Sequence, residues 1–203
     1  MWYRTQFKRF SDAGGKFAQP LIEERYNLED ALVVAGFVNS FIRHADVVRV
    51  ANLAQIVNAI APVLTIGDRL LIQSIYWPLA MMASRREGVS LVVGLEGPGY
   101  VSDSYGPAGY LDVAAIQDGS RVHVSMINRS DRPGVAEVSV ADAGVRAIDG
   151  AQLMTGSGPE AENTLDQPEN VTAVDYGEGR LVGGKAVFEM PPLSYLTATL
   201  NLD

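Results

Sequence analysis

Two pairs of adjacent carboxylates, Glu23-Glu24 and Glu29-Asp30, are the first side chains to consider for acid–base chemistry in this sequence. Hydrolysis by a carboxylate pair needs the two groups to face each other across the bond that breaks. Neighbours in sequence on a helix do not face one another. Glu29 and Asp30 also follow Asn27, a residue type that caps helices, at the point where negative charge offsets the helix dipole. We therefore expect neither pair to be catalytic.

Histidine, cysteine and glycine offer little further chemistry. The 203 residues contain two histidines and no cysteine, which excludes disulfides and thiolate metal sites and leaves little for zinc. His44 has no neighbouring Ser, Cys or carboxylate motif, so we expect it to close a helix together with Arg43, where cations are favoured. The glycines lie in turns and not in a phosphate-binding motif. No metal and no organic cofactor is expected.

The segment Tyr26 to Pro62 must position whatever chemistry the chain has. Its first half predicts a mostly covered helix that starts at Asn27, with apolar residues at helical spacing (28, 31, 32, 35, 38, 41 and 42). Its second half predicts an apolar strand over Val47–Val57, in which Asn52, Gln55 and Asn58 need hydrogen-bond partners if they are buried. A helix that leads into a buried strand is half of a βαβ unit and requires neighbours.

The pattern changes after a second, shorter helix. Residues 64–72 predict a hairpin around Gly67-Asp68, and residues 75–85 predict a helix that tolerates Pro78 in its first turn. A boundary is expected at residues 85–88, followed by alternating strands bounded by turn residues. They are expected at residues 89–93, 111–116, 121–127, 135–140, 186–190 and 193–200. Alternation at 123–126 and 137–140 indicates half-buried antiparallel strands of a jelly-roll β-sandwich, crossed by a loop at 156–170.

Charge and hydropathy limit the partners. The net charge is −8, from 16 basic and 24 acidic residues, which disfavours nucleic acid and anionic membranes. The N-terminus lacks the apolar core of a signal peptide, and no apolar run approaches the ~20 residues that a membrane-spanning helix needs. The aromatic and basic residues interleaved in residues 1–25 are expected to form a loop packed by its own aromatics. We expect a soluble, cytoplasmic protein.

Several stretches together resemble the C-terminal part of an α-L-arabinofuranosidase of glycoside hydrolase family 51. They are Trp2-Tyr3-Arg4, residues 26–46 (YNLEDALVVAGFVNSFIRHAD), residues 51–65 (ANLAQIVNAIAPVLT), residues 73–78 (QSIYWP), residues 161–164 (AENT), residues 168–171 (PENV) and residues 191–196 (PPLSYL). The resemblance spans essentially the whole chain.

This resemblance implies a (β/α)8 barrel followed by an antiparallel β-sandwich. Residues 1–86 would be the last βα units of an incomplete barrel of the TIM type, and residues 87–203 the C-terminal sandwich domain. Family members are retaining enzymes in which one Glu is the acid/base and another the nucleophile, the latter in a Glu-Trp-Asn-Val-Trp-Tyr stretch. Because this chain opens Met-Trp-Tyr, Met1 falls on the Val position. Both catalytic carboxylates are therefore expected upstream of Met1.

Two substrate-binding positions of the family survive by resemblance, namely Trp2 and Gln73. Trp2 matches a tryptophan of the arabinose pocket, and Gln73 matches a glutamine on the loop after the eighth barrel strand. An aromatic face packs on sugar C–H groups, and an amide both donates and accepts hydrogen bonds. The alternatives are a frayed terminal aromatic for Trp2 and a loop-capping amide for Gln73.

The expected function is that of a segment of an enzyme that releases terminal arabinofuranose from arabinan or arabinoxylan side chains. This chain alone is expected to be inactive. Its expected partners are arabinose-containing oligosaccharides, and either the missing N-terminal barrel portion or a second copy of the chain. The alternative function is a non-catalytic sandwich module for carbohydrate binding or assembly.

Overall fold

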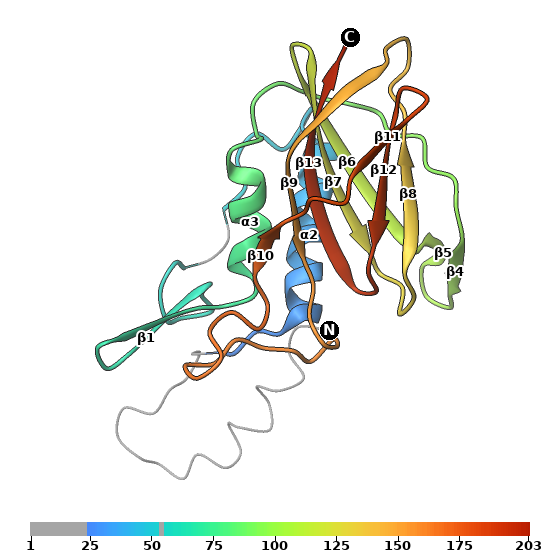
Figure 1. The fold of residues 1–203 in the computed structure, drawn as a ribbon. Helices are drawn as coiled ribbons and strands as arrows, with labels where there is room; N and C mark the ends of the chain where they lie inside the picture. Colours follow the sequence, from blue (N-terminus) through green and yellow to red (C-terminus); the bar gives the residue numbers. More distant parts are fainter. Residues whose placement is uncertain (1–23, 53–54) are drawn as a thin grey trace.

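The computed structural model describes residues 24–52 and 55–203 (Figure 1). Over these residues the chain is mostly β-structure. Two helices are present in this part, α2 (Leu28–Arg43) and α3 (Tyr76–Ala83). The strands are β1 (Val63–Ile66), β2 (Arg69–Ile72), β3 (Val89–Ser90), β4 (Gly99–Ser102), β5 (Gly106–Gly109), β6 (Leu111–Asp118), β7 (Arg121–Asn128), β8 (Gly134–Val138), β9 (Val145–Met154), β10 (Ala173–Asp175), β11 (Arg180–Val182), β12 (Lys185–Met190) and β13 (Ser194–Leu202).

A β-sandwich forms the larger part of the molecule, as predicted. One sheet has the order β10-β9-β13-β7-β6-β3, and the facing sheet has the order β11-β12-β8. All strand pairs in both sheets are antiparallel. Apolar side chains from both sheets, such as Phe188, Met126 and Leu196, fill the space between them. The jelly-roll connectivity stays a prediction.

The two helices cover the other face of the larger sheet (Figure 1). Leu28, Ala31 and Ala35 of α2 form one buried cluster with Met81 and Met82 of α3 and with residues of the sheet that include Ile116, Ile127, Met154 and Tyr195. Complete burial of each large side chain in such a cluster stabilises the fold by roughly 1.5–3 kcal/mol. The helices of the first part and the strands of the second therefore share a core, while the division into domains at residues 86 and 87 stays a prediction.

Strand β7 differs from the half-buried strand that its alternation predicted. Val122, Val124 and Met126 face the sandwich interior. His123 and Ser125 are also buried, with 5% and 0% exposure. The prediction was wrong about exposure because α2 lies on this side of the sheet. Buried polar side chains need hydrogen-bond partners: Ser125 donates to Asn39 of α2, and His123 Nδ1 lies 2.9 Å from Thr199 Oγ1 of β13.

The strand predicted over Val47–Val57 is absent from the described residues of that segment, which exclude 53 and 54. Val47, Val50 and Ile56 are 72%, 77% and 74% exposed, and the segment contributes one isolated bridge, from Val57 to Val63. A parallel strand forms when neighbouring strands pair with it, and the described residues provide none here. The barrel remnant therefore stays a prediction.

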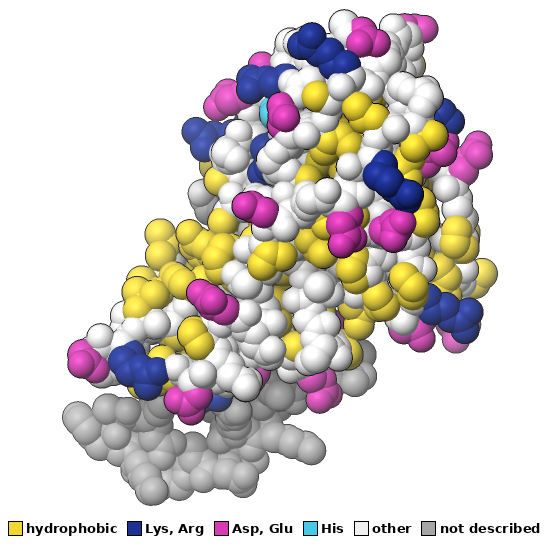
Figure 2. Space-filling view, in the orientation of Figure 1, with side chains coloured by type: hydrophobic (Ala, Val, Ile, Leu, Met, Phe, Trp, Pro, Cys, Tyr) yellow, Lys and Arg dark blue, Asp and Glu magenta, His cyan; other side chains and the backbone are white. Residues whose placement is uncertain are grey.

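The hairpin predicted at 64–72 is confirmed as β1 and β2, and the second helix is confirmed as α3. Apolar side chains gather on one side of the molecule (Figure 2). The exposed apolar residues of β1, β2 and α3 include Ile66, Leu70, Tyr76 and Leu79, with exposures of 43%, 59%, 37% and 37%. We call these four residues the apolar side surface. Within the described residues, no helix is long and apolar enough to cross a membrane.

Candidate functional site

Gln73 lies directly after β2 and is 2% exposed. Its Oε1 accepts the backbone N–H of Tyr26 at 3.1 Å, and its Nε2 donates to the carbonyl oxygens of Glu24 at 3.0 Å and Ala61 at 2.6 Å. Both N–H groups of the amide are thus engaged, and one lone pair of Oε1 remains. The amide fixes two other stretches of chain to the end of β2.

Trp2, the second residue predicted to bind sugar, lies outside the described residues. The sugar-binding roles of Trp2 and Gln73 both stay predictions. The contacts of Gln73 agree with the alternative of an amide that holds a loop, because all three go to backbone atoms.

The start of α2 lies beside Gln73. Asn27 Oδ1 accepts the backbone N–H of Asp30 at 3.0 Å, and the Asp30 carboxylate accepts that of Asn27 at 3.1 Å. Ser74 Oγ donates to the Asn27 carbonyl at 2.6 Å. Burial raises the pKa of Asp30 above its usual value, against the opposing hydrogen bond from Asn27. The predicted helix-start role of this carboxylate is confirmed, and its capping hydrogen bond accounts for its position.

Residues 156–170 form an irregular loop, as predicted, but this loop reaches the start of α2. The Ala161 carbonyl accepts the N–H of Leu28 at 2.8 Å, and the Pro159 carbonyl accepts that of Glu29 at 3.0 Å. The first N–H groups of a helix have no partner inside the helix. The loop supplies those partners, so its predicted course across the sandwich was wrong in this respect.

Asn163 fixes that loop. Its Nδ2 donates to the carbonyls of Ile72 at 3.0 Å and Val171 at 2.9 Å, and its Oδ1 accepts the N–H of Val171 at 2.6 Å. One buried amide therefore ties the end of β2 to the sandwich. We call Asn27, Asp30, Gln73, Ser74 and Asn163 the α2 junction.

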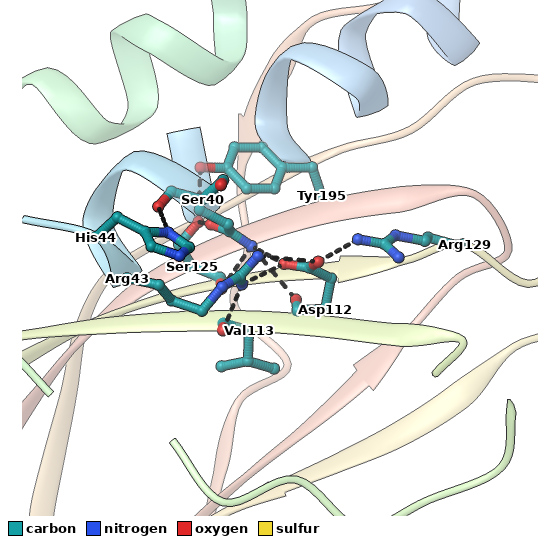
Figure 3. A network of polar contacts seen from close by, with 9 residues as sticks. Ser40, Arg43, His44, Asp112, Val113, Ser125, Arg129 and Tyr195 are labelled. Carbon is teal, nitrogen blue, oxygen red and sulfur yellow. Dashed lines mark hydrogen bonds and ion pairs between the residues drawn. The ribbon is translucent and has the colours of Figure 1, made fainter. Parts of the chain in front are cut away.

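A second polar cluster lies near the other end of α2 (Figure 3). Asp112 of β6, whose side chain is 10% exposed, accepts hydrogen bonds from Arg43 Nη1 at 2.9 Å and from Asn39 Nδ2 at 2.7 Å, and pairs with Arg129. Charge-assisted contacts of this kind are stronger than neutral ones. They hold the C-terminal half of the helix on the sheet.

A chain of neutral hydrogen bonds continues from this carboxylate into the core. Ser125 Oγ donates to Asn39 Oδ1, and Ser125 Oγ and the Tyr195 hydroxyl are 2.9 Å apart. Because the single Ser125 proton is already donated, Tyr195 must be the donor in the second bond. We call Asn39, Arg43, Asp112, Ser125, Arg129 and Tyr195 the Asp112 network.

The pKa values of Asp112 and Tyr195 in this network are shifted in opposite directions. Burial alone would raise the pKa of Asp112, but hydrogen bonds from Arg43 and Asn39 and the charge of Arg129 hold it below its usual value. Burial raises the pKa of Tyr195, which is fully enclosed. The carboxylate therefore stays ionised and the phenol stays protonated near neutral pH.

Arg85 is a buried cation that the sequence did not single out. It is 7% exposed and donates to the carbonyls of Met81 and Gly150 and, at 3.4 Å, to Gln152 Oε1, while its Nε has no partner in the described part of the chain. Gly150 lies in a bulge of β9 and has a φ of +54°, which glycine adopts without strain. Burial lowers the pKa of Arg85. The side chain joins α3 to the bulge.

Neither cluster is arranged for catalysis by itself. The α2 junction uses its polar atoms on backbone groups, and the carboxylate of the Asp112 network is held between two arginines. Within residues 24–52 and 55–203, no group of three or more His, Asp or Glu residues could hold a metal ion. His44 caps the end of α2, as predicted, and its Nδ1 lies 2.8 Å from the Ser40 carbonyl.

Sequence reasoning missed most of the Asp112 network, because its members lie far apart in the chain. Two local signals could have identified it. Asn39 lies among the apolar residues of a predicted helix, and Ser125 lies in an apolar strand. Asn163 belongs to one of the stretches that carry the family resemblance, but was assigned no role.

Comparison with known proteins identifies the family. The family model of the α-L-arabinofuranosidase C-terminal domain matches residues 1–194. The chain is 32% identical over 200 residues to an intracellular exo-α-(1→5)-L-arabinofuranosidase of Streptomyces lividans. The aligned region covers 96% of this chain and 30% of that enzyme. The chain thus spans about a third of that relative's length.

Two solved structures have the same fold. The family 51 α-L-arabinofuranosidase AbfB of Bifidobacterium longum superposes with a TM-score of 0.83 at 24% identity, over 91% of this chain and 37% of that one. The family 51 arabinofuranosidase of Xanthomonas axonopodis pv. citri superposes with a TM-score of 0.80 at 26% identity, over 89% of this chain and 37% of that one. The chain belongs to the α-L-arabinofuranosidase C-terminal domain family and corresponds to the C-terminal part of enzymes of glycoside hydrolase family 51.

Proposed function

We propose that this chain is the C-terminal part of a retaining α-L-arabinofuranosidase that releases terminal arabinofuranose from arabinan or arabinoxylan side chains. The observation that carries the proposal is the family match over residues 1–194, together with a relative of that activity that is about three times as long. The name of that relative also places it inside the cell, and we extend this location, the cytoplasm, to the present protein. The non-catalytic alternative is not favoured, because the relatives are enzymes.

Both catalytic carboxylates would come from a part of the enzyme that precedes the segment Met-Trp-Tyr. Retention requires two carboxyl groups about 5–5.5 Å apart. The carboxylates of the α2 junction and of the Asp112 network already serve the fold, as a helix cap and as an ion-pair centre. The present chain would contribute Trp2 and Gln73 to the arabinose pocket.

The apolar side surface supports this arrangement. Exposed apolar side chains that gather on one side of a molecule mark a contact with another surface. Ile66, Leu70, Tyr76 and Leu79 all belong to residues 1–86, the part that the family resemblance assigns to the barrel. We assign this surface to the packing of the chain against the rest of its barrel.

Complementation tests the proposal. The purified chain is mixed with the N-terminal part of a related enzyme, and release of the aryl group from an aryl α-L-arabinofuranoside is followed. We expect turnover from the mixture and none from either part alone. Turnover by this chain alone would overturn the placement of the catalytic carboxylates, and an inactive mixture that does form a complex would overturn the assigned activity.

A matched pair of variants tests the apolar side surface. Leu70→Glu places a charge at a position that is 59% exposed in this surface, and Val182→Glu places one at a position that is 57% exposed on β11 of the sandwich. We expect Leu70→Glu to abolish complementation and Val182→Glu to preserve it. Equal effects of the two charges would show that this surface is not the contact.

A further inference from the structure

The hairpin of β4 and β5 carries an unusual concentration of tyrosine. Three of the eight tyrosines of the chain, Tyr100, Tyr105 and Tyr110, lie within eleven residues. Tyr105 is 91% exposed near the hairpin tip, and Tyr100 is 42% exposed. None of the three hydroxyls has a hydrogen-bond partner among the described residues. Tyrosine combines a flat apolar ring with a polar tip, which suits it to recognition surfaces.

Strand register places two of these rings on one face. Tyr100 pairs with Ala108, and Tyr110 donates its backbone N–H to the Pro98 carbonyl at 3.2 Å, so Pro98, Tyr100, Ala108 and Tyr110 share one side of the hairpin. The centroids of the Tyr100 and Tyr110 rings are 5.4 Å apart, with the planes tilted by 39°. We call this pair the tyrosine platform.

Two glycines lie on the other side of the hairpin, together with Val101 and Pro107. Gly99 and Gly109 face each other across the two strands, and a Cβ at Gly99 would lie 2.5 Å from the Ala108 carbonyl oxygen. A hollow of about 420 Å³ borders the hairpin, and its lining includes Glu96 and Tyr100 and contains no Lys, Arg or His. A site without cations does not select for phosphate or other anions, whereas a carboxylate and exposed backbone groups bind hydroxyls.

From these observations, we propose that the tyrosine platform is a glycan-binding site that stacks the neutral arabinofuranosyl units of the polymer. The choice of sugar rests on the function proposed above. The ring faces would pack on sugar C–H groups, and the phenol hydroxyls and Glu96 would bind sugar hydroxyls. Such a site would hold the polymer on the enzyme.

The test measures binding of linear α-(1→5)-linked arabino-oligosaccharides to the full 203-residue chain by calorimetry and by NMR shift changes. We expect Tyr100→Ala to weaken binding about tenfold, which corresponds to ~1.4 kcal/mol, and Tyr100→Phe to retain most of it because the ring remains. Val182→Ala is the control, since Val182 is 57% exposed on β11, outside both the hairpin and the apolar side surface. It should not change the affinity.

Thermal unfolding of each variant shows whether the hairpin change has unfolded the domain, and Glu96→Gln provides a variant that leaves the rings in place. Affinity that is equal in all variants, or absent in the parent chain, overturns the proposal. Loss of self-association in Tyr100→Ala, seen by light scattering without any sugar binding, would assign the platform to a second copy instead. These readouts need no catalysis, so failed complementation would affect the proposed activity and leave the binding result interpretable.

Discussion

The two ends of α2 are attached to the sandwich by different chemistry. At the N-terminal end, the α2 junction uses neutral amides, a hydroxyl and a capping carboxylate, most of which bind backbone atoms. At the C-terminal end, the Asp112 network uses one carboxylate between two arginines. The first end therefore depends on complete pairing of buried groups, and the second depends on charge.

This difference has a consequence for function. Gln73, the residue that the family resemblance assigns to the sugar, belongs to the neutral end, where the structure already uses its amide. The ionic end has no such assignment, so disturbing it tests the attachment of the helix alone. Variants at the two ends can therefore separate effects on stability from effects on substrate.

The largest effect is expected at the neutral end. Gln73→Ala removes three hydrogen bonds to backbone atoms, two of them buried, and creates a cavity, so we expect the free energy of unfolding to fall by about 3 kcal/mol. Urea unfolding measures this loss. Gln167→Ala, at an exposed position of the neighbouring loop, should change it by less than ~0.5 kcal/mol. A Gln73→Ala chain as stable as the parent would show that this amide is not a structural tie.

A smaller loss is expected at the ionic end. Asp112→Asn removes the charge between Arg43 and Arg129 while keeping the shape, and should lower the free energy of unfolding by about 2 kcal/mol. The arginines are each 37% exposed, so water offsets part of the loss. The control is Asp175→Asn, at an exposed end of β10. High salt should reduce the difference between Asp112→Asn and the parent chain, and an unchanged difference would contradict the ionic account.

Lowering the pH should reduce the contribution of Asp112 to folding stability and increase that of Asp30. Both changes should be smaller than the losses expected from Gln73→Ala and Asp112→Asn. The folded pKa of Asp112 is lowered, so its contribution is present above the usual Asp pKa of about 3.9 and is lost as pH falls through the folded value. The pKa of Asp30 is raised, so its protonation favours the folded state as pH falls through that raised value.

Unfolding measured between about pH 6 and pH 3 checks the two signs. Asp112→Asn should flatten the acid loss of stability, and Asp30→Asn should steepen it. Matching slopes in the two variants would show that the ends do not differ in this way. The parent chain and both variants also contain His123. Burial and the charges of Arg121 and Arg85 lower its pKa, so it adds a loss of stability that begins as pH falls through the usual His value near 6.5.

The smallest effect is expected inside the Asp112 network. Tyr195→Phe removes one buried hydrogen bond and leaves Ser125 paired with Asn39, so the free energy of unfolding should fall by about 1 kcal/mol. Tyr76→Phe on the surface of α3 is the matched control. A loss as large as that of Asp112→Asn would mean that the neutral part of the network carries as much energy as the ionic part.

The elements that were predicted correctly are those fixed by local sequence. Asn27 and the helical spacing that follows it specify α2, because a cap and an apolar face act within a few residues. The strand predicted over Val47–Val57 failed because its pairing requires neighbours that its own sequence cannot supply. Strand β9 was missed because Asp149-Gly150 resembles a turn, whereas in the structure it forms the bulge that receives Arg85.

The candidate site shows the same limit more clearly. Asn39 and Asp112 are 73 residues apart in sequence, and no local spacing connects them. Asn39 and Ser125 are polar residues in apolar surroundings, and this signal could have shown that buried partners exist but not which ones. The predicted roles of Trp2 and Gln73 came from the family resemblance alone.

The position of β13 has a consequence for the order in which the molecule is made. This strand spans residues 194–202, yet it lies between β9 and β7 in the middle of the larger sheet and supplies Tyr195 to the surface that α2 covers. Ribosomes release chains from the N-terminus onward. Helix α2 and the strands β7 and β9 therefore leave the ribosome with their central partner still unmade. Over that interval β7 and β9 lack the strand that pairs with both of them, and the sheet surface that α2 covers is incomplete.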